Sequence, residues 1–334
     1  MNETILNVHD LNVAFHHRGK GKTTQVLDHV SFDVERGKIL GIVGESGSGK
    51  SVCMHSILRL LGGDAEIRGE VLFDGKDLLS CSEKEMRAVR GGRISMVFQD
   101  PMTALNPVYT IGTQIKESLR HHRSDISNKD AYIIDLLASV GISDGKRRLR
   151  QYPHEVSGGI RQRIAIAMAL ASDPDILIAD EPTTALDVTV QAQIIALIRE
   201  LTRKRNMTTI IITHDLGIVA GLCDNMIVLY GGRICEKGTT REIFTAPKHE
   251  YTRGLLAAVP GAGKGGRLVP ISGSPVNLSA RPDGCAFCPR CAKAMEVCLT
   301  DAAPAHRFSE THEARCWTNE IPEGLTPFAE EGEG

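Results

Sequence analysis

Gly44-Glu45-Ser46-Gly47-Ser48-Gly49-Lys50-Ser51 matches every constrained position of the phosphate-loop pattern G-x-x-x-x-G-K-S/T. A β-rich run at residues 38–43 precedes it, and a helix-compatible stretch begins at Lys50. In this order, glycine-permitted turns aim backbone N–H groups at an anion, and the following helix adds the positive end of its dipole. The sequence therefore predicts a phosphate site with contacts from Gly44, Ser46, Gly47, Ser48 and Gly49.

The two residues that close the loop carry the chemistry of a nucleoside triphosphate. Lys50 is expected to reach the β and γ phosphates, and Ser51 is expected to place its hydroxyl on Mg²⁺. The alternative is a chance glycine-rich turn. The position of the loop between a predicted strand and a predicted helix disfavours that alternative.

Short apolar runs recur along the chain and are separated by lengths that suit helices. They lie at residues 93–98, 176–179, 208–213 and 226–230. These runs predict buried strands, and their alternation with helices predicts an α/β fold around a mostly parallel sheet. Gly231-Gly232 predicts a hairpin that continues into residues 233–236.

Two further regions differ from this α/β pattern. The β-rich runs at residues 5–15 and 25–34 predict strands near the start of the chain. Between residues 111 and 141 apolar positions recur at helical spacing and strand signals vanish, so a helical insertion is expected over about 102–158.

Polar residues follow three of the predicted strands. Asp180 and Glu181 end the run at 176–179, Gln99 follows 93–98, and His214 follows 208–213. Ligands of such sheets bind at the carboxyl ends of the strands. There Asp180 can hold Mg²⁺ through water, Glu181 can polarise an attacking water, His214 can reach a γ-phosphate, and Gln99 can bind Mg²⁺ or that water. Each residue alone would be an ordinary strand-end residue, but together with the phosphate loop they predict a catalytic set.

Length and composition place the chain among ordinary globular proteins. It has 334 residues, 42% hydrophobic and 24% charged, which excludes wholesale disorder and leads us to expect two domains. The net charge of −2 provides no basic field for nucleic acid, so no nucleic-acid partner is expected. The longest apolar run, Ile164 to Ala171, is too short to span a membrane, and the first ten residues lack a signal-peptide pattern. A cytoplasmic location is therefore expected.

Five of the nine cysteines lie within 32 residues near the end of the chain, at positions 285, 288, 291, 298 and 316. In a reducing compartment this clustering favours a metal site over disulfides. The remaining four, Cys53, Cys81, Cys223 and Cys235, are scattered, and we expect them to be small buried hydrophobic residues.

The segment Val156-Ser157-Gly158-Gly159-Ile160, shortly before the carboxylate strand, completes a series that resembles the ATP-binding-cassette (ABC) ATPases. The series runs through the phosphate loop, Gln99, Ser157-Gly158-Gly159, Asp180-Glu181, Ala185-Leu186-Asp187 and His214. The family pattern Leu-Ser-Gly-Gly-Gln differs here at its first and last positions. From the residues themselves, Ser157 is expected to cap a helix that starts near Ile160, with N–H groups of Gly158 and Gly159 free for an anion.

The resemblance implies roles for these residues. One ATP contacts the phosphate loop of one subunit and the Ser157, Gly158 and Gly159 segment of another, so the active form is a head-to-tail dimer. Phe15 matches the aromatic residue that stacks on adenine, and Asp187 belongs to the nucleotide-binding set. The implied fold is a phosphate-loop cassette with a parallel-sheet core, an antiparallel β subdomain and a helical subdomain.

A closer resemblance, to the oligopeptide/dipeptide importer ATPases, covers nearly the whole chain. It rests on residues 98–107, residues 179–187 and His249-Glu250-Tyr251-Thr252. This subfamily, which also serves nickel and related solutes, carries a Cys-rich C-terminal extension, matched here by Cys285, Cys291, Cys298 and Cys316. Four thiolates suit either zinc or a 4Fe–4S cluster. The resemblance favours the cluster, with Cys288 as a possible substitute ligand.

The resemblance also implies domains, partners and a location. The cassette is expected at residues 1–258, the Cys-rich domain at 259–320 and a disordered acidic tail at 321–334. The expected function is ATP hydrolysis for peptide uptake, at the cytoplasmic face of the inner membrane as a peripheral protein. The expected partners are a second homologous ATPase or a second copy of the chain, two permease subunits, and an extracytoplasmic solute-binding protein.

Three alternatives remain open: an importer ATPase for nickel or another small solute, a soluble ABC ATPase without a permease, and a redox or metal-sensing module that only binds nucleotide. The absence of a long coiled-coil insertion argues against the soluble ATPase, and intact Glu181 and His214 argue against the sensor.

Overall fold

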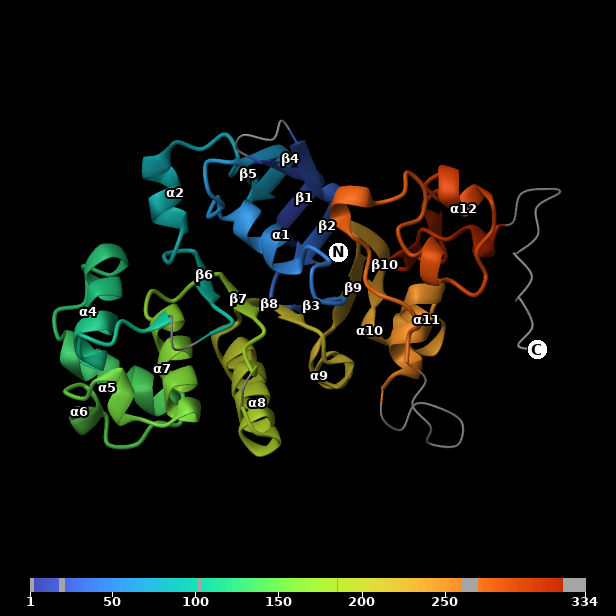
Figure 1. Cartoon of the computed structure of the whole chain (residues 1–334). Helices are drawn as coiled ribbons and strands as arrows, with labels where there is room; N and C mark the ends of the chain where they lie inside the picture. The colour runs from blue at the N-terminus through green and yellow to red at the C-terminus, as the bar shows by residue number, and fades with distance from the viewer. Residues whose placement is uncertain (1–2, 18–21, 101–103, 185, 260–269, 321–334) are drawn as a thin grey trace. The chain divides into compact units, whose positions relative to one another are not determined.

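The computed structural model describes residues 3–17, 22–100, 104–184, 186–259 and 270–320 (Figure 1). The chain divides into two compact units. Unit 1 is built mainly from Ser80–Ile212 together with Glu35–Ile39, and unit 2 is built from Thr4–Val34, Leu40–Leu79 and the chain from Thr213 onward. The predicted linker near residue 260 and the predicted acidic tail lie outside the described residues.

Unit 1 contains a parallel sheet. Its strands, in the order β8-β7-β6, are β8 (Thr208–Thr213), β7 (Ile176–Asp180) and β6 (Ile94–Val97). Every residue of β7 and β8 is buried, as expected for strands that are covered on both faces. Each strand agrees with a predicted apolar run to within one or two residues.

Helices make up the rest of unit 1 in the described part of the chain. They are α2 (Glu83–Val89), α4 (Ile111–His122), α5 (Lys129–Ser139), α6 (Gly145–Arg148), the 3-10 turn η1 (Pro153–Glu155), α7 (Gly158–Leu170) and α8 (Val188–Arg205). Helix α5 contacts both α4 and α6, and α4 and α5 also contact α7 (Figure 1). They occupy the region predicted as a helical insertion, although the predicted start at residue 102 lies outside the described residues.

Unit 2 contains two groups of strands. The first has the order β2-β1-β4-β5, with β2 (Lys22–Glu35), β1 (Thr4–His17), β4 (Ala65–Phe73) and β5 (Lys76–Asp77). Strand β4 is antiparallel to both β1 and β5, which gives the expected antiparallel β region.

The second group holds the element that precedes the phosphate loop. Strand β3 (Ile39–Val43) pairs in parallel with β9 (Asn225–Tyr230), and β9 forms an antiparallel hairpin with β10 (Arg233–Thr239) across Gly231 and Gly232, as predicted. Short strands β12 (Glu313–Ala314) and β11 (His306–Arg307) continue this group beyond β10. The associated helices are α1 (Lys50–Ile57), α9 (Leu216–Leu222), α10 (Thr240–Thr245) and α11 (Glu250–Ala257).

The segment 270–320 contains little regular structure. Its elements besides β11 and β12 are η2 (Leu278–Ala280), η3 (Cys288–Arg290), α12 (Val297–Thr300) and η4 (Trp317–Asn319). Its small core consists of Cys288, Ala294, Met295 and Cys298, packed against Cys285, Cys291, Val297 and Trp317. Half of these eight side chains are thiols, so the segment depends on sulfur for much of its interior.

No helix in the described part of the chain combines the length and the apolar character needed to cross a bilayer.

Candidate active site

The phosphate loop joins β3 to α1 in unit 2 and depends on glycine at both ends. Gly44 has φ 155°, and a Cβ there would lie 2.1 Å from the carbonyl oxygen of Leu229. Gly49 is the N-cap residue of α1 with φ 102°, and a Cβ there would lie 2.7 Å from Cδ2 of Leu27. Larger residues at these two positions would push the loop away from its neighbouring strands.

Two polar groups of the loop have the chemistry of an anion site. The Lys50 side chain is 6% exposed, and its ammonium donates to the carbonyl oxygens of Gly44 (2.7 Å) and Glu45 (2.9 Å). The Ser48 hydroxyl is buried and has no hydrogen-bond partner among the described residues. A cation held over the loop beside an unsatisfied hydroxyl suits a phosphate oxygen.

The other predicted ligands in unit 2 are accessible or partly accessible. Ser46 and Gly47 are exposed at the turn of the loop, and Ser51 is half-buried in the first turn of α1. Phe15 is half-buried on β1, opposite Ala65 of β4. His214 is exposed directly after β8.

In unit 1 the structure joins two of the predicted catalytic residues. The Gln99 amide nitrogen donates to Oε2 of Glu181 at 3.0 Å, although 82 residues separate them. Asp180 is buried at the end of β7, and the backbone N–H of Glu181 donates to the Ile212 carbonyl at 2.9 Å. Parallel β6 and β7 bring their carboxyl ends together, which explains why two strand-end residues meet.

No role was predicted for a third residue, Thr184, which also contacts Glu181. The Thr184 hydroxyl donates to the same Glu181 oxygen at 2.9 Å. The signal was present, since a hydroxyl three residues after a carboxylate in a turn can reach back to it. Glu181 also has φ 45°, a left-handed backbone that costs roughly 1–3 kcal/mol at a non-glycine residue. The two donors and the turn hold this carboxylate in one orientation.

The Ser157-Gly158-Gly159 segment begins α7. Ser157 is the N-cap residue, but its hydroxyl makes no capping hydrogen bond, and the helix starts at Gly158 rather than near Ile160. The capping contact predicted for this serine is therefore wrong, while its position at the helix start is correct. Ser157 and Gly158 are exposed, so the start of this 13-residue helix is accessible to solvent. Asp187 caps α8 by accepting from the Val190 N–H at 2.9 Å.

Family comparisons agree with this arrangement of residues. Residues 27–184 match the ABC transporter family, and residues 235–298 match the oligopeptide/dipeptide transporter C-terminal region. The chain is 49% identical over 320 residues to the dipeptide transport ATP-binding protein DppD of Bacillus subtilis, covering 94% of this chain and 95% of the relative. The chain belongs to the oligopeptide/dipeptide family of ABC transporter ATP-binding proteins.

Other relatives of this ABC ATPase lead to the same family. The oligopeptide transport ATP-binding protein OppD of Salmonella typhimurium is 46% identical over 316 residues, covering 94% of this chain and 93% of the relative. Among solved structures, a dimeric ATP-binding cassette in a post-hydrolysis state with ADP and Pi has a TM-score of 0.62 and 26% identity, covering 71% of this chain and 99% of its own. The fold is therefore that of an ABC cassette.

The C-terminal segment of this ABC ATPase brings five cysteines to one pocket. Its lining includes Cys285, Cys288, Cys291, Cys298 and Cys316, and its volume of about 10 Å³ has room for one water molecule. Burial, followed by the charges of neighbouring thiols, raises the pKa of Cys285 and of Cys291 to about 12. Within the described ranges no three His, Cys, Asp or Glu side chains are arranged to hold a metal ion. The pocket thus brings suitable donors together in a closely packed arrangement.

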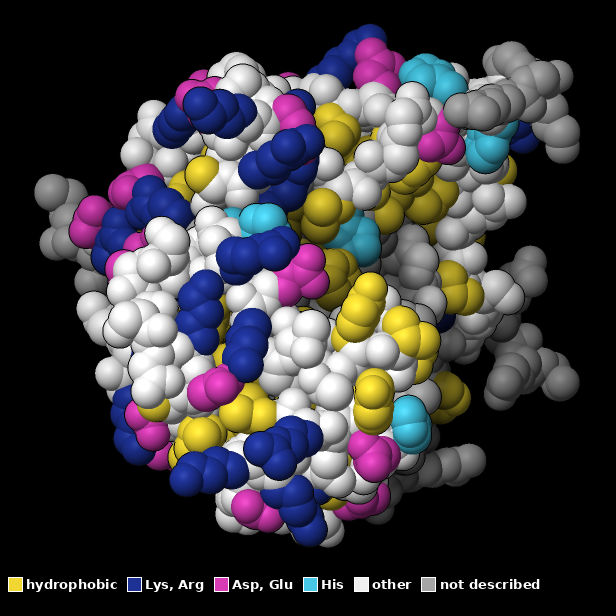
Figure 2. Space-filling model, turned by 90° about the vertical axis from the view of Figure 1, so that its left-hand side faces the viewer, with side chains coloured by type: hydrophobic (Ala, Val, Ile, Leu, Met, Phe, Trp, Pro, Cys, Tyr) yellow, Lys and Arg dark blue, Asp and Glu magenta, His cyan; other side chains and the backbone are white. Residues whose placement is uncertain are grey.

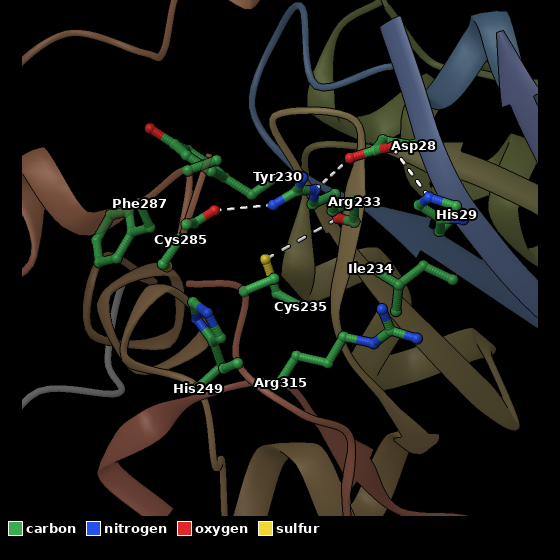
Figure 3. A pocket seen from close by; sticks show the side chains of 14 residues that line it. Asp28, His29, Tyr230, Arg233, Ile234, Cys235, His249, Cys285, Phe287 and Arg315 are labelled. Carbon is green, nitrogen blue, oxygen red and sulfur yellow. Dashed lines mark hydrogen bonds and ion pairs between the residues drawn. The ribbon is translucent and has the colours of Figure 1, made fainter. Parts of the chain in front are cut away.

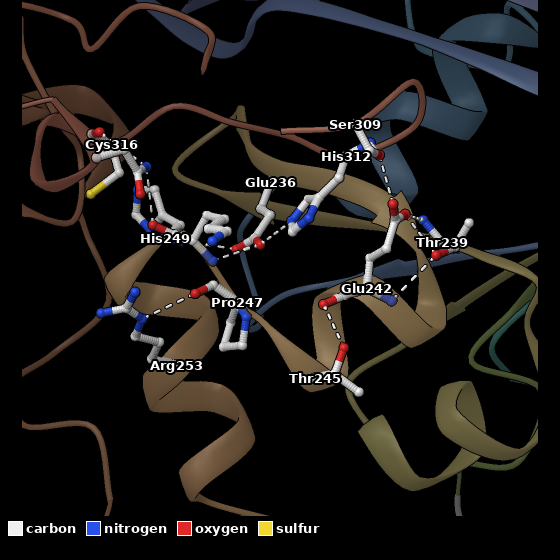
Figure 4. Close-up of polar contacts among 12 residues, drawn as sticks. Glu236, Thr239, Glu242, Thr245, Pro247, His249, Arg253, Ser309, His312 and Cys316 are labelled. Atoms are coloured by element: carbon white, nitrogen blue, oxygen red, sulfur yellow. Dashed lines mark hydrogen bonds and ion pairs between the residues drawn. The ribbon is translucent and has the colours of Figure 1, made fainter. Parts of the chain in front are cut away.

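Buried polar contacts tie this segment to the rest of unit 2. Glu236 on β10 is 0% exposed and accepts from Nε2 of His312 (2.7 Å) and from the backbone N–H groups of Lys248 (2.8 Å) and His249 (2.9 Å) (Figure 4). Nδ1 of His249 accepts from the Tyr251 N–H, and burial lowers the pKa of His249 to about 4. A neutral histidine and a fully paired glutamate therefore hold the start of α11 and the C-terminal hairpin together.

A second anchor lies beside a cavity of about 140 Å³ (Figure 3). Asp28 of β2 accepts from Nε of Arg233 at 2.5 Å and from Nη2 of Arg281 at 2.8 Å. Arg281 also donates to the Gly231 carbonyl at 2.9 Å. The segment is thus held by ion pairs on β2 as well as by the contacts on β10.

The four scattered cysteines are buried, as expected: Cys53, Cys81, Cys223 and Cys235. Burial raises the pKa of the Cys53 thiol to about 12, so this residue next to the phosphate loop is unreactive.

Proposed function

We propose that this chain is the ATP-hydrolysing subunit of an importer for dipeptides or oligopeptides. The observation that carries the proposal is 49% identity over 94% of the chain to a dipeptide transport ATP-binding protein. The match of residues 235–298 to the C-terminal region of oligopeptide/dipeptide transporters supports it, because that region lies outside the general cassette match.

The proposed chemistry assigns one ATP to the phosphate loop and the strand-end residues. Lys50, Ser46, Ser48 and the loop N–H groups bind the phosphates, and Phe15 stacks on the adenine. Glu181, oriented by Gln99 and Thr184, polarises the attacking water, and His214 contacts the γ-phosphate.

The Mg²⁺ that such enzymes use would be held by Ser51, by Gln99 and, through water, by Asp180. A hydroxyl, an amide oxygen and a carboxylate are the oxygen donors that this ion prefers. The donation from the Gln99 nitrogen to Glu181 leaves the amide oxygen for a cation. Bound there, Mg²⁺ would neutralise charge on the phosphates.

A second ATPase subunit completes the proposed site. Ser157, Gly158 and Gly159 lie at an outward-facing helix start, where N–H groups attract an anion. The solved cassette cited above is a dimer with ADP and Pi. Asp187, at the start of α8, belongs to the same proposed nucleotide-binding set. We infer a homologous partner or a second copy of this chain.

The region from Val108 through α4 to η1 is the proposed permease-docking surface. Val108 is 70% exposed and Tyr109 is 53% exposed, and Tyr152 is also exposed. Figure 2 views the side of the molecule that carries these helices, with exposed hydrophobic side chains among Lys and Arg. Exposed aromatic and aliphatic residues of this kind are typical of interaction sites. Two permease subunits, with a solute-binding protein beyond them, would place the chain at the cytoplasmic face of the inner membrane.

Co-purification tests the importer against the soluble ABC ATPase. From gently solubilised membranes, the chain is expected to carry two permeases and a second ATPase with it. The Tyr109→Ala/Tyr152→Ala variant should lose most of this association, whereas Leu60→Ala, an exposed residue in unit 2, should retain it. Recovery of the parent chain without membrane subunits, with its ATPase activity intact, would favour the soluble enzyme.

We also propose that Cys285, Cys291, Cys298 and Cys316 hold a 4Fe–4S cluster, with zinc as the alternative and Cys288 as a substitute ligand. The support is that all five thiols line one pocket in a segment with little other core. Such a group would supply cross-links that stabilise the segment.

Anaerobically purified protein is expected to show broad visible absorbance and bound iron and sulfide. Because the pKa values of Cys285 and Cys291 are raised, metal binding must release protons, so affinity should rise with pH. Cys316→Ser should abolish the absorbance and Cys53→Ser should preserve it. Colourless protein with stoichiometric zinc would support the alternative, and protein with neither metal would refute the site.

A further inference from the structure

One side chain of the Cys-rich segment reaches the phosphate loop. Arg290, in η3, donates from Nη1 to Oε2 of Glu45 at 2.6 Å and from Nη2 to Oε1 at 3.0 Å. The Arg290 side chain is 6% exposed and Glu45 is 22% exposed. A two-point fork of this kind fixes the carboxylate in direction as well as distance.

Glu45 also contacts Lys50, the lysine expected to bind the phosphates. Its carbonyl oxygen accepts from the Lys50 ammonium at 2.9 Å, and its backbone N–H donates to the Tyr251 hydroxyl at 2.9 Å. One residue therefore separates the Arg290 guanidinium from the group expected to bind the β and γ phosphates. A displacement of Glu45 changes the position of Lys50.

Arg290 is itself held from several sides. Nε donates to the Ser272 carbonyl at 2.8 Å, and Nη1 donates to the Tyr230 hydroxyl at 3.1 Å. The guanidinium carbon lies 5.8 Å from the ring centres of both Tyr230 and Phe287. The ring centres of Phe287 and Tyr251 lie 5.3 Å apart. Aromatic side chains therefore contact both partners of the ion pair, Arg290 through Phe287 and Glu45 through the Tyr251 hydroxyl. A turn of the guanidinium away from the loop would lose its contacts with Ser272, Tyr230 and Phe287.

Two cysteines close to Arg290 in the chain line the cysteine pocket. Arg290 lies between Cys288 and Cys291, both of which line that pocket. The Cys291 N–H donates to the Cys288 carbonyl at 3.1 Å, and the Arg290 N–H donates to the Phe287 carbonyl at 2.9 Å. A rearrangement of the thiols therefore moves the backbone that carries Arg290.

We propose that Arg290 is a positioning residue for ATP binding, which sets the phosphate loop through Glu45 and makes its geometry depend on the order of the cysteine pocket. This inference rests on the proposed ATPase function. Arg290 also neutralises the Glu45 carboxylate, which would otherwise repel the triphosphate. The competing explanation is a structural tether that holds the segment on unit 2 without affecting the loop.

Steady-state kinetics of the full chain distinguish the two. Arg290→Gln is expected to raise KM for ATP by roughly tenfold, the loss of one charge-assisted contact, with kcat changed less than twofold. Arg281→Gln is the matched control, because Arg281 also anchors the segment through a buried ion pair, to Asp28 rather than to the loop. It should lower the melting temperature with KM unchanged.

A double variant that lacks both charges of the Arg290–Glu45 ion pair provides a second test of KM. Glu45→Gln in the Arg290→Gln background should leave KM well above the parent value, because removing the unpaired carboxylate does not restore the two-point contact that positions the loop. Full recovery of KM would show that Arg290 acts only by neutralising Glu45 and would overturn the positioning role. Cys291→Ser should raise KM in the parent but not further in Arg290→Gln, since both act through η3.

An unchanged KM in folded Arg290→Gln, or an equal rise in Arg281→Gln, would overturn the positioning role. A parent protein without Mg²⁺-dependent ATP hydrolysis would instead refute the proposed function. Should Arg290→Gln fail to fold, Glu45→Gln alone, at a partly exposed position, still tests whether the contact affects KM.

Discussion

Glu181→Gln is expected to lower kcat by about 10²–10⁴-fold, because an amide cannot take a proton from the attacking water. The fold should be unaffected. The Gln99 and Thr184 donors both bind one Glu181 oxygen, and a glutamine carbonyl can accept from them in the same position. ATP binding should persist, so ATP-bound dimers should accumulate.

Single-turnover hydrolysis and size-exclusion chromatography with Mg²⁺-ATP measure these two effects. Glu117→Gln, the same chemical change at an exposed position on α4, serves as the control and should behave like the parent. Hydrolysis at the parent rate in Glu181→Gln would remove Glu181 as the general base.

Lys50→Ala is expected to weaken ATP binding by roughly 10–100-fold, because one charge-assisted contact to a phosphate contributes about 1.5–3 kcal/mol. The Lys50 ammonium is buried and donates to both the Gly44 and Glu45 carbonyls, and an alanine at this position leaves no positive charge there. Lys50→Arg should restore little, since the larger fork does not fit the same two carbonyls.

Equilibrium binding of a fluorescent ATP analogue, with a thermal melt of each variant, measures this loss. Lys146→Ala, an exposed lysine of α6, should bind like the parent. If Lys50→Ala retains both its melting temperature and parent affinity, the phosphate loop is not the ATP site.

Much of the fold was predictable because its signals are local. Buried strands such as Ile176–Asp180 and Thr208–Thr213 appear as short apolar runs, and the loop before Lys50 has a pattern that few other structures require. Helix α7 was less predictable at its start. Ser157 has the residue type of a cap and lies at the N-cap position, yet its hydroxyl makes no capping hydrogen bond.

The chemistry of the site is evident along the chain: a glycine-rich loop with Lys50, carboxylates at a strand end, and five clustered thiols. Which side chains contact one another depends on the folded arrangement. The contact of Gln99 with Glu181 spans 82 residues, and that of Arg290 with Glu45 spans 245. Sequence patterns such as hydrophobic periodicity indicate the structure of residues that are close together in the chain. Contacts between distant residues depend instead on which strands are neighbours and on how a buried side chain packs.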